Sequence, residues 1–576
     1  MTQKTLKIHT ENILPIIKKW LYSEKDIFVR ELVSNSCDAL RKLQILGKLD
    51  DPRIDITIDK NAKTITFADS GIGMTADEVE KYIAQIAFSG AEEFVAKYQA
   101  KDSIIGHFGL GFYSAYMVSS SVTLDTLSHE DGAEAALWTC DGSSTYSLEK
   151  GSRTTRGTTI TLHVSEEEYL EDFHLRSILK KYCAFLPYPI YFNGTRINQE
   201  EPLWLKNPSE CTDKEYLDFY HTLYPMESDP IFWIHLSVDY PFHLQGILYF
   251  PKISRRFEWG KSSIQLFCSR VFVSDNCKDL LPDFLTCLRG ALDSPDIPLN
   301  VSRSTLQMDR TVRQLATHIT KKVADRLSTL YQNEKEKFLA AWSDIEIVIK
   351  LGLLQDEKFY ERAKDFLVWK TVSGSWILLS DQKKVFYTAD PHAPILELFK
   401  DKEVIIASTP VDSAVMNFLE HKLSMQFQRV DGALDDNILD SAREKTLLDA
   451  EGKTESARIA DYFRSVLSCP VEAKSLASDA LPAFLMLEEK SRRLREQLAL
   501  YEKELPVAKQ TFVVNTNSPL INKLVALKDK KPVLAEQIAK HLYDLSLMSQ
   551  KELEGAELPK FAQRSSQLIE TLLSAE

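Results

Sequence analysis

The chain has 576 residues, of which 44% are apolar and 27% are charged. One hydrophobic core seldom supports a chain of this length, so we expect several globular domains, and the composition excludes a largely disordered protein. The formal net charge of −13 argues against nucleic acid as a partner, because phosphate binding needs a concentrated basic surface.

Neither a membrane segment nor a secretory signal is indicated. Residues 1–10 contain no apolar stretch of the kind that a signal peptide needs, and no apolar run approaches the roughly 20 residues that cross a bilayer. The eight cysteines are widely spread without a Cys-x-x-Cys pair, which is typical of reduced thiols rather than of a zinc site or a disulfide framework. We therefore expect a cytoplasmic protein without a membrane partner.

The first part of the chain combines helical and strand patterns. Apolar residues recur at helical spacing from Ile13 to Leu46, and alternating apolar residues then predict strands over 54–58 and 64–68. Another strand is predicted over 158–164. This order of elements predicts an α/β sandwich over residues 1–193.

Two further domains are expected after it. Strand patterns over 231–250 and helical patterns over 307–350 predict an α/β domain at 200–430. The polar, acidic passage 431–454 is expected to be a linker, since its few apolar residues could not anchor a core. Amphipathic stripes then predict a mainly helical domain at 455–576, whose apolar faces form either its own core or a helix bundle between subunits.

Polar residues at helical spacing give the first candidate site. Glu31, Asn35 and Asp38 stand at i, i+4 and i+7, which places their side chains on one helical face. Burying two carboxylates and an amide is costly unless a ligand binds there. An amide oxygen suits Mg²⁺, and Glu31 could polarise a water molecule for attack on a phosphoryl group. A solvated helix face is the alternative.

Two glycine motifs give further candidates. The sequence Asp69-Ser70-Gly71-Ile72-Gly73-Met74 directly follows a predicted strand, where glycine permits a tight turn or a close approach to a ligand; a strand-ending turn capped by aspartate is the alternative. The sequence Gly106-His107-Phe108-Gly109-Leu110-Gly111 precedes an expected helix over 112–118, whose N-terminus could bind phosphate.

In this order, the three motifs resemble the ATP site shared by heat-shock protein 90 chaperones, type II topoisomerases, MutL repair proteins and sensor histidine kinases. Several other segments are similar to heat-shock protein 90 in particular: 22–32, 109–116, 202–208, 270–273, 298–303 and 513–521. The resemblance covers nearly the whole chain and is weakest between residues 345 and 455. It implies an α+β multidomain fold with an N-terminal ATPase domain, an α/β middle domain and a C-terminal dimerisation domain.

The resemblance also implies roles for individual residues. Glu31 would be the catalytic base, Asn35 the Mg²⁺ ligand and Asp69 the adenine-binding residue. Arg303 would reach the γ-phosphate of ATP from the middle domain, supplying positive charge during hydrolysis. Further nucleotide contacts, together with the lid hinge and the phosphate loop, would come from Asp38, Gly73, Met74, Gly106, Gly109, Gly111, Phe112 and Thr158.

The implied function is that of an ATP-dependent chaperone of the compact bacterial type. ATP would close a homodimer on unfolded or partly folded client proteins, with other cytosolic chaperones as further partners. The chain lacks the long charged linker of eukaryotic cytosolic relatives and ends Leu-Leu-Ser-Ala-Glu, without their acidic tail. Both features favour a bacterial cytoplasmic protein.

Three positions depart from the family pattern. Phe88 replaces a customary lysine near the phosphates, His107 replaces glutamine and Ser304 replaces glutamate. The loss of a cation could weaken ATP binding or alter lid closure, so a non-hydrolysing scaffold is one alternative. A DNA-repair or topoisomerase ATPase is another, although it would need a basic DNA-binding surface.

Overall fold

The computed structural model describes residues 24–86, 88, 94, 109–198, 201–253, 263–275, 280–297, 310–379, 382–432, 434, 438–444, 452–489, 491–494 and 510–574. The chain divides into two compact units, Met1–Arg326 and Leu327–Glu576. The domain boundaries expected at 193–200 and 430–455 stay predictions. No helix in the described ranges is both long enough and apolar enough to span a membrane.

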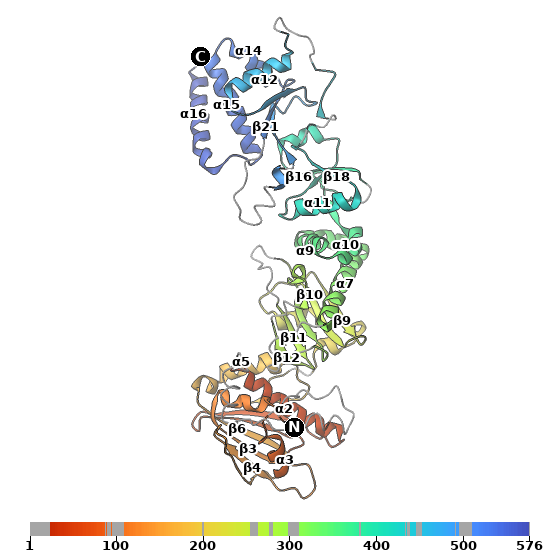
Figure 1. Cartoon of the computed structure of the whole chain (residues 1–576), viewed down its shortest axis with the longest axis vertical. Helices are drawn as coiled ribbons and strands as arrows, with labels where there is room; N and C mark the ends of the chain where they lie inside the picture. Colours follow the sequence, from red (N-terminus) through yellow and green to blue (C-terminus); the bar gives the residue numbers. More distant parts are fainter. Residues whose placement is uncertain are drawn as a thin grey trace, which may run out of the picture. The chain divides into compact units, whose positions relative to one another are not determined.

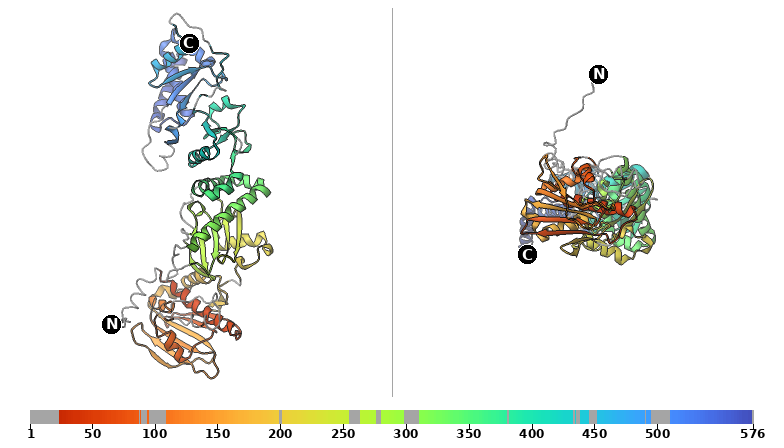
Figure 2. Two further views of the ribbon diagram at one scale, coloured as in Figure 1. Left: turned by 45° about the vertical axis from the view of Figure 1, so that its right-hand side comes forward. Right: turned by 90° about the horizontal axis from the view of Figure 1, so that it is seen from below.

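An eight-stranded sheet forms the first part of unit one, with helices packed on it (Figures 1 and 2). Its strand order is β5-β4-β3-β6-β2-β1-β7-β8, and every neighbouring pair is antiparallel except β1 and β7. The strands are β1 (Ile54–Asp59), β2 (Thr64–Asp69), β3 (Ser119–Leu127), β4 (Ala136–Cys140), β5 (Ser147–Lys150), β6 (Gly157–Val164), β7 (Ile190–Phe192) and β8 (Thr195–Arg196). The helices are α2 (Ile27–Ile45), α3 (Ala76–Tyr82), η2 (Gly111–Met117), η3 (Glu167–Leu170) and α5 (Asp172–Cys183).

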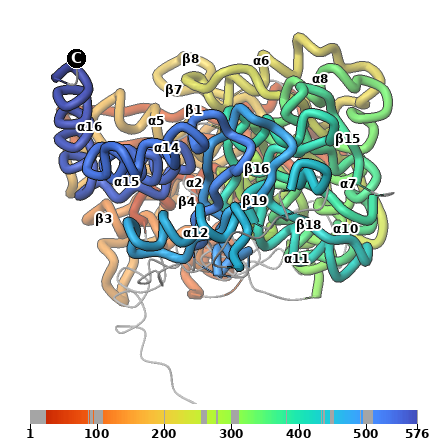
Figure 3. Tube along the Cα trace, turned by 90° about the horizontal axis from the view of Figure 1, so that it is seen from above, coloured from red at the N-terminus to blue at the C-terminus, as the bar shows by residue number. Residues whose placement is uncertain are grey.

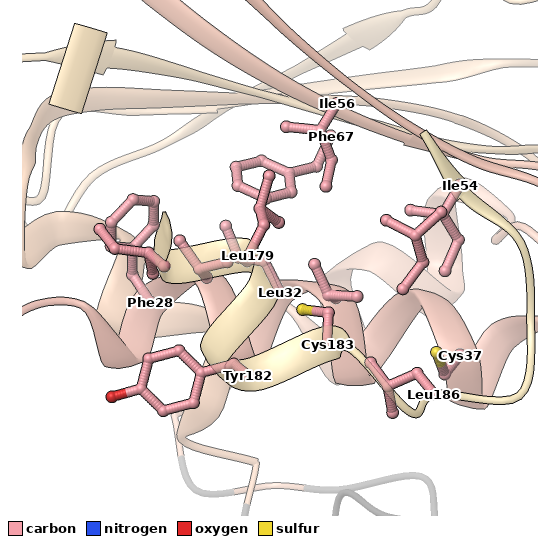
Figure 4. Packing of buried hydrophobic residues seen from close by; sticks show 14 of the residues in the cluster. Phe28, Leu32, Cys37, Ile54, Ile56, Phe67, Leu179, Tyr182, Cys183 and Leu186 are labelled. Atoms are coloured by element: carbon pink, nitrogen blue, oxygen red, sulfur yellow. The ribbon is translucent and has the colours of Figure 1, made fainter. Parts of the chain in front are cut away.

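The core of this part lies between the sheet and the helices α2 and α5. Figure 4 shows Phe28 and Leu32 of α2 and Leu179 of α5 pointing toward Ile56 and Phe67 of the sheet. Because side chains alternate along a strand, β1 and β2 turn every second residue inward. The helix and the strands predicted here are confirmed within the described residues.

The helix expected over 112–118 is present, but it is the 3₁₀ helix η2. The Ser119 hydroxyl donates a 2.7 Å hydrogen bond to the Ala115 carbonyl, and the Ser114 hydroxyl donates one of 2.6 Å to the Gly111 carbonyl. The Ala115 carbonyl also accepts a 3.3 Å hydrogen bond from the Val118 N–H, so the serine hydroxyls add to the backbone hydrogen bonds of this short helix.

A five-stranded sheet forms the second part of unit one. Its order is β12-β11-β13-β10-β9, with β11 and β13 parallel and the other pairs antiparallel. Apolar residues of this part, including Trp204, Phe267 and Phe272, belong to the same buried cluster as the core of the first sheet. The elements are η4 (Leu203–Leu205), η5 (Pro208–Glu210), α6 (Asp213–Leu223), β9 (Phe232–Val238), β10 (Leu244–Phe250), β11 (Ser263–Cys268), β12 (Val271–Ser274), η7 (Asp283–Leu285) and β13 (Arg289–Asp293).

Helix α7 (Arg310–Asn333) contains the division between the units, and unit two follows with three small sheets, β14-β15, β17-β16-β18 and β19-β21-β20. Its strands are β14 (Val368–Lys370), β15 (Trp376–Leu378), β16 (Lys384–Thr388), β17 (Val404–Ile406), β18 (Gln426–Arg429), β19 (Val471–Lys474), β20 (Ala483–Leu487) and β21 (Gln510–Asn515). Its helices are α8 (Lys335–Ala340), α9 (Trp342–Gln355), α10 (Glu357–Ala363), η8 (Lys364–Phe366), η9 (Pro394–Phe399), α11 (Asp412–Leu423), α12 (Glu455–Val466), α14 (Pro519–Lys528), α15 (Pro532–Ser549), η11 (Gly555–Glu557) and α16 (Leu558–Leu573).

The C-terminal stripes form the predicted helices. Figure 3 shows α14, α15 and α16, in which each helix packs against the next one along the chain.

The expectation that 431–454 could not anchor a core is wrong at Ile438, which is buried with Val513 in an apolar cluster. Its neighbour Leu439 forms a β-bridge with Leu476. Ile438 is therefore buried by packing against a distant part of the chain, although the residues around it in the sequence are polar.

Candidate nucleotide site

The first polar motif lies on α2 as predicted. Glu31 and Asp38 are only 6% and 7% exposed, and Asn35 is half-buried. A solvated helix face is therefore excluded for the two carboxylates. Arg30 donates two hydrogen bonds to Glu31 Oε1, from Nε at 3.0 Å and from Nη2 at 2.7 Å, which offsets the cost of burying that charge.

Glycine at the start of η2 lies directly against the other carboxylate oxygen of Glu31. A Cβ atom at Gly111 would come within 2.5 Å of Oε2, so any larger residue would displace the carboxylate. Phe112, the next residue, is buried against Trp138 with ring centroids 5.6 Å apart. The structure thus brings the first and third motifs together, with Glu31 between Arg30 and Gly111.

Asp69 ends β2 in a buried position. Its Oδ1 accepts hydrogen bonds from the backbone N–H groups of Gly71 at 2.9 Å and Thr158 at 3.3 Å. Burial raises the pKa of the Asp69 carboxyl to about 6, although these bonds, the charge of Arg153 and a hydrogen bond with Ser36 act in the opposite direction. Ser36 comes from α2, so the first and second motifs also meet here.

A threonine that sequence reasoning missed joins two of the predicted residues. Thr126 Oγ1 accepts a 3.0 Å hydrogen bond from the Met74 N–H and lies 3.0 Å from the Thr158 hydroxyl. Gly73, which directly precedes Met74, has φ +65°. A Cβ atom at position 73 would come within 1.8 Å of the Leu127 carbonyl oxygen. Thr126 lies in an ordinary alternating strand, so no local pattern marked it.

Of the residues predicted for the lid hinge and the middle domain, the structure describes only some. Gly109 has φ +61°, and a Cβ there would come within 2.4 Å of the Phe88 carbonyl oxygen, which fits the glycine expected at this place. Gly106, His107, Arg303 and Ser304 lie outside the described residues.

Comparison with known proteins decides the family. A family model described as Hsp90 protein matches residues 192–576, which is more than half of the chain. The chain belongs to the Hsp90 family. A second model, described as a histidine kinase-, DNA gyrase B- and HSP90-like ATPase, matches residues 22–169, the part that contains the described site.

Relatives of this Hsp90 chain agree with both matches. It is 40% identical to the chaperone protein HtpG of Bacteroides fragilis strain YCH46 over 92% of this chain and 85% of that protein. It is 39% identical to the HtpG of Porphyromonas gingivalis strain ATCC 33277 over 93% and 86%. It is 29% identical to the mitochondrial TNF receptor-associated protein 1 homolog of Dictyostelium discoideum over 99% and 86%. The chain is an ATP-dependent molecular chaperone with ATPase activity, and its ATPase domain implies nucleotide binding.

At the Hsp90 position expected to hold lysine, Phe88 stacks on Tyr82. The two ring centroids are 6.1 Å apart with an interplanar angle of 7°. The ammonium group of Lys81 lies 5.1 Å from the Tyr82 ring centroid and 5.7 Å from that of Phe88. Thus a cation approaches this place from α3, held over two aromatic rings.

Lys42, which sequence reasoning did not single out, stands on α2 one turn after Asp38. Burial lowers the pKa of its ammonium group, against the charges of Asp38 and Glu78. Its Nζ lies 5.6 Å from the ring centroid of Phe94. Lys42 stands four residues after Asp38, so extending the i, i+4 spacing by one turn would have found it.

Proposed function

We propose that ATP binds in unit one with its adenine at Asp69 and its phosphates between Asn35 and the segment 109–112. The observation that carries this proposal is the buried pair of carboxylates, Glu31 and Asp69, at two places where glycine backbone approaches α2 or β2 closely. Asp38, Gly73, Met74 and Thr158 supply further contacts to the nucleotide. Gly106, Gly111 and Phe112 complete the phosphate loop.

Glu31 is the proposed general base. Because its Oε1 accepts hydrogen bonds from Arg30, the oxygen suited to take a proton is Oε2, which faces Gly111. As the water oxygen attacks the γ-phosphorus atom, its proton passes to this carboxylate, and the bond to the leaving ADP oxygen breaks. Arg303 is the cation proposed to stabilise the charge on the transferring phosphoryl group.

Asn35 is the proposed Mg²⁺ ligand. Its half-buried amide lies one helical turn from Glu31. Within the described ranges, no group of three or more His, Cys, Asp or Glu side chains is placed to hold a metal ion. This fits an ion held by one amide oxygen, water and nucleotide phosphates. When bound, Mg²⁺ offsets negative charge on the phosphates.

The proposed working form is a cytoplasmic homodimer that clamps unfolded or partly folded client proteins. Apolar residues left exposed on α16 support dimerisation: Ile569 is 57% exposed, Leu572 50% and Leu573 76%. Exposed apolar side chains gathered on one helix are typical of a protein–protein contact. Ile569→Glu with Leu572→Glu should shift the sedimentation coefficient toward that of a monomer, whereas an unchanged coefficient would place the dimer contact elsewhere.

The test of the site compares ATP hydrolysis by the parent protein, Glu31→Ala and Arg303→Ala, with nucleotide binding measured for each. We expect turnover to fall by about 10²-fold or more in both variants while binding is retained. Glu149→Ala, an exposed glutamate on β5, is the control and should keep parental turnover. Continued hydrolysis by Glu31→Ala would overturn the proposed role of this residue.

A further inference from the structure

A continuous series of side-chain contacts leads from Glu31 to the second sheet of unit one. Arg30 donates two hydrogen bonds to Glu31 Oε1, and its guanidinium carbon lies 6.0 Å from the centroid of the Tyr182 ring. The Tyr182 ring packs edge-on against Phe272, with centroids 5.7 Å apart and an interplanar angle of 70°. Tyr182 thus separates the guanidinium group beside Glu31 from a strand of the other sheet.

All four residues are buried and come from three different elements. Arg30 is 2% exposed, Glu31 6%, Tyr182 3% and Phe272 5%. Arg30 and Glu31 lie on α2, Tyr182 on α5 and Phe272 on β12. Figure 4 shows Tyr182 on α5, at the edge of the cluster that contains Phe28 and Leu32 of α2. Close packing at such positions passes a displacement of one side chain to its neighbours.

The strand that carries Phe272 is tied to the segment directly after α5. Just before β12, Arg270 donates a 2.8 Å hydrogen bond from Nε to the Phe185 carbonyl. The Arg270 backbone N–H donates to both carboxylate oxygens of Asp293, at 3.2 and 3.0 Å. Phe272 is therefore held against Tyr182 by polar contacts as well as by the shared apolar core.

The contacts fix one orientation of the Glu31 carboxylate. Arg30 binds Oε1, while Oε2 faces Gly111. A guanidinium group is a planar set of donors, so its own position determines where the bound oxygen lies. The aromatic ring of Tyr182 limits the positions open to that guanidinium group.

We propose that Tyr182 is a positioning residue for ATP hydrolysis, which keeps Arg30 on Glu31 Oε1 and makes the presentation of Oε2 depend on the packing of β12. The inference rests on the proposed role of Glu31 as general base. The aromatic ring of Tyr182 performs this positioning, because its hydroxyl group donates a 3.2 Å hydrogen bond to Glu24 instead.

The test measures kcat and KM for ATP in the full-length chain with Tyr182→Leu and Tyr182→Phe. Misplacing a reacting group is expressed in kcat, so Tyr182→Leu should lower kcat about tenfold with KM unchanged. Tyr182→Phe keeps the ring and should retain parental kcat. A purely structural role would instead lower the fraction of active protein and leave kcat per active site unchanged, as counted by nucleotide titration.

Two further variants test whether the effect passes through Tyr182 and Phe272, and whether it differs from a general loosening of the core. Tyr169→Leu removes a similarly buried tyrosine that contacts α2 through Phe28, with centroids 5.3 Å apart, and should keep parental kcat. Phe272→Leu should lower kcat in the same direction as Tyr182→Leu, and the double variant should lose no more than the larger single effect, because both act through one contact. This second route also applies if Tyr182→Leu fails to fold.

The outcomes separate this inference from the role of Glu31. If Glu31→Ala is inactive but Tyr182→Leu and Phe272→Leu both keep parental kcat, the positioning role is wrong and the general base stands. If Tyr169→Leu lowers kcat as much as Tyr182→Leu, the effect is general loosening of the core, and the inference is again overturned. If Glu31→Ala hydrolyses ATP at the parental rate, the proposed base itself fails.

Discussion

The backbone of Gly111 lies against the Glu31 carboxylate so closely that a Cβ atom at position 111 would come within 2.5 Å of Oε2. A methyl carbon and a carboxylate oxygen do not approach so closely, so a methyl group at position 111 must move either η2 or the carboxylate. Arg30 restrains the carboxylate through Oε1. The contact therefore links the helix face of the first motif to the glycine of the third.

Gly111→Ala should lower kcat for ATP hydrolysis by about 10²-fold, because a displaced base no longer meets the attacking water. Steady-state hydrolysis is the measurement, with nucleotide affinity determined separately. The matched control is Gly555→Ala, where an added Cβ would meet no atom within 4 Å; like Gly111, it has no positive φ. Parental kcat in Gly111→Ala would mean that Oε2 is not the oxygen that takes the proton.

The carboxyl of Asp69 predicts a pH dependence of stability. Burial raises its pKa in the folded protein to about 6, above the ordinary value of 3.8. Between these two values the folded state binds more protons than the unfolded state, so this group lowers the free energy of unfolding as the pH rises from about 4 to about 6. Asp69→Asn should therefore raise the apparent melting temperature relative to the parent at about pH 7.5, and by less at about pH 5.

The control for that experiment is Asp141→Asn. Hydrogen bonds from Ser143 lower the pKa of the Asp141 carboxyl, so any stability it contributes is lost only below the acidic end of the range. Its difference from the parent should stay constant between about pH 5 and about pH 7.5. A constant difference for Asp69→Asn as well would show that Asp69 does not titrate near pH 6.

Thr126 belongs to none of the sequence motifs, yet we expect its hydroxyl group to contribute to stability and to nucleotide affinity. Its hydroxyl is buried and joins Met74, Gly157 and Thr158 through hydrogen bonds. Thr126→Val keeps the shape but leaves the Met74 N–H without this partner, which should cost about 1–3 kcal/mol. Chemical denaturation would measure the change, and nucleotide affinity should fall with it.

Thr123→Val is the matched control on the same strand. Its hydroxyl makes no side-chain hydrogen bond within the described part of the chain, and the residue is only half-buried. Loss of stability equal to that of Thr126→Val would indicate that β3 tolerates no valine, rather than that the hydroxyl joins the two motifs.

The sequence predicted those parts of the site that local spacing and chain reversal determine. Helical spacing placed Glu31 and Asp38 on one face of α2. Gly73 was expected where the chain turns tightly and Gly109 before a helix end, and the structure gives both a positive φ. Thr126 and Tyr182 could not be found in this way, because their roles depend on which strand or helix packs beside them. The family was suggested by the resemblance of several motifs. The burial of Ile438 could not be predicted, because it depends on packing against a segment that is distant in the sequence.

A buried ion pair in unit two gives the last prediction. Lys350 of α9 places Nζ 2.5 Å from Asp412 Oδ1 of α11 and 3.3 Å from Glu346 Oε1, and 4.2 Å from the ring centroid of Trp369. The side chains of Lys350 and Asp412 are 2% and 5% exposed. Asp412→Ala leaves the ammonium group buried with one carboxylate partner fewer, which should destabilise this unit by about 3–5 kcal/mol.

The pair Lys540 and Glu536, 2.7 Å apart but about half exposed, supplies the control, since Glu536→Ala should change stability little. The measurement is hydrogen exchange of amides in α9 and α11 in the full chain. Lys350→Met with Asp412→Leu should recover much of the loss, because replacing both charges by apolar groups removes the desolvation cost of each. If the double variant stays as unstable as Asp412→Ala, the damage comes instead from the 2.7 Å hydrogen bond that the Thr409 N–H donates to Asp412 Oδ2, and the ion pair contributes little to holding α9 and α11 together.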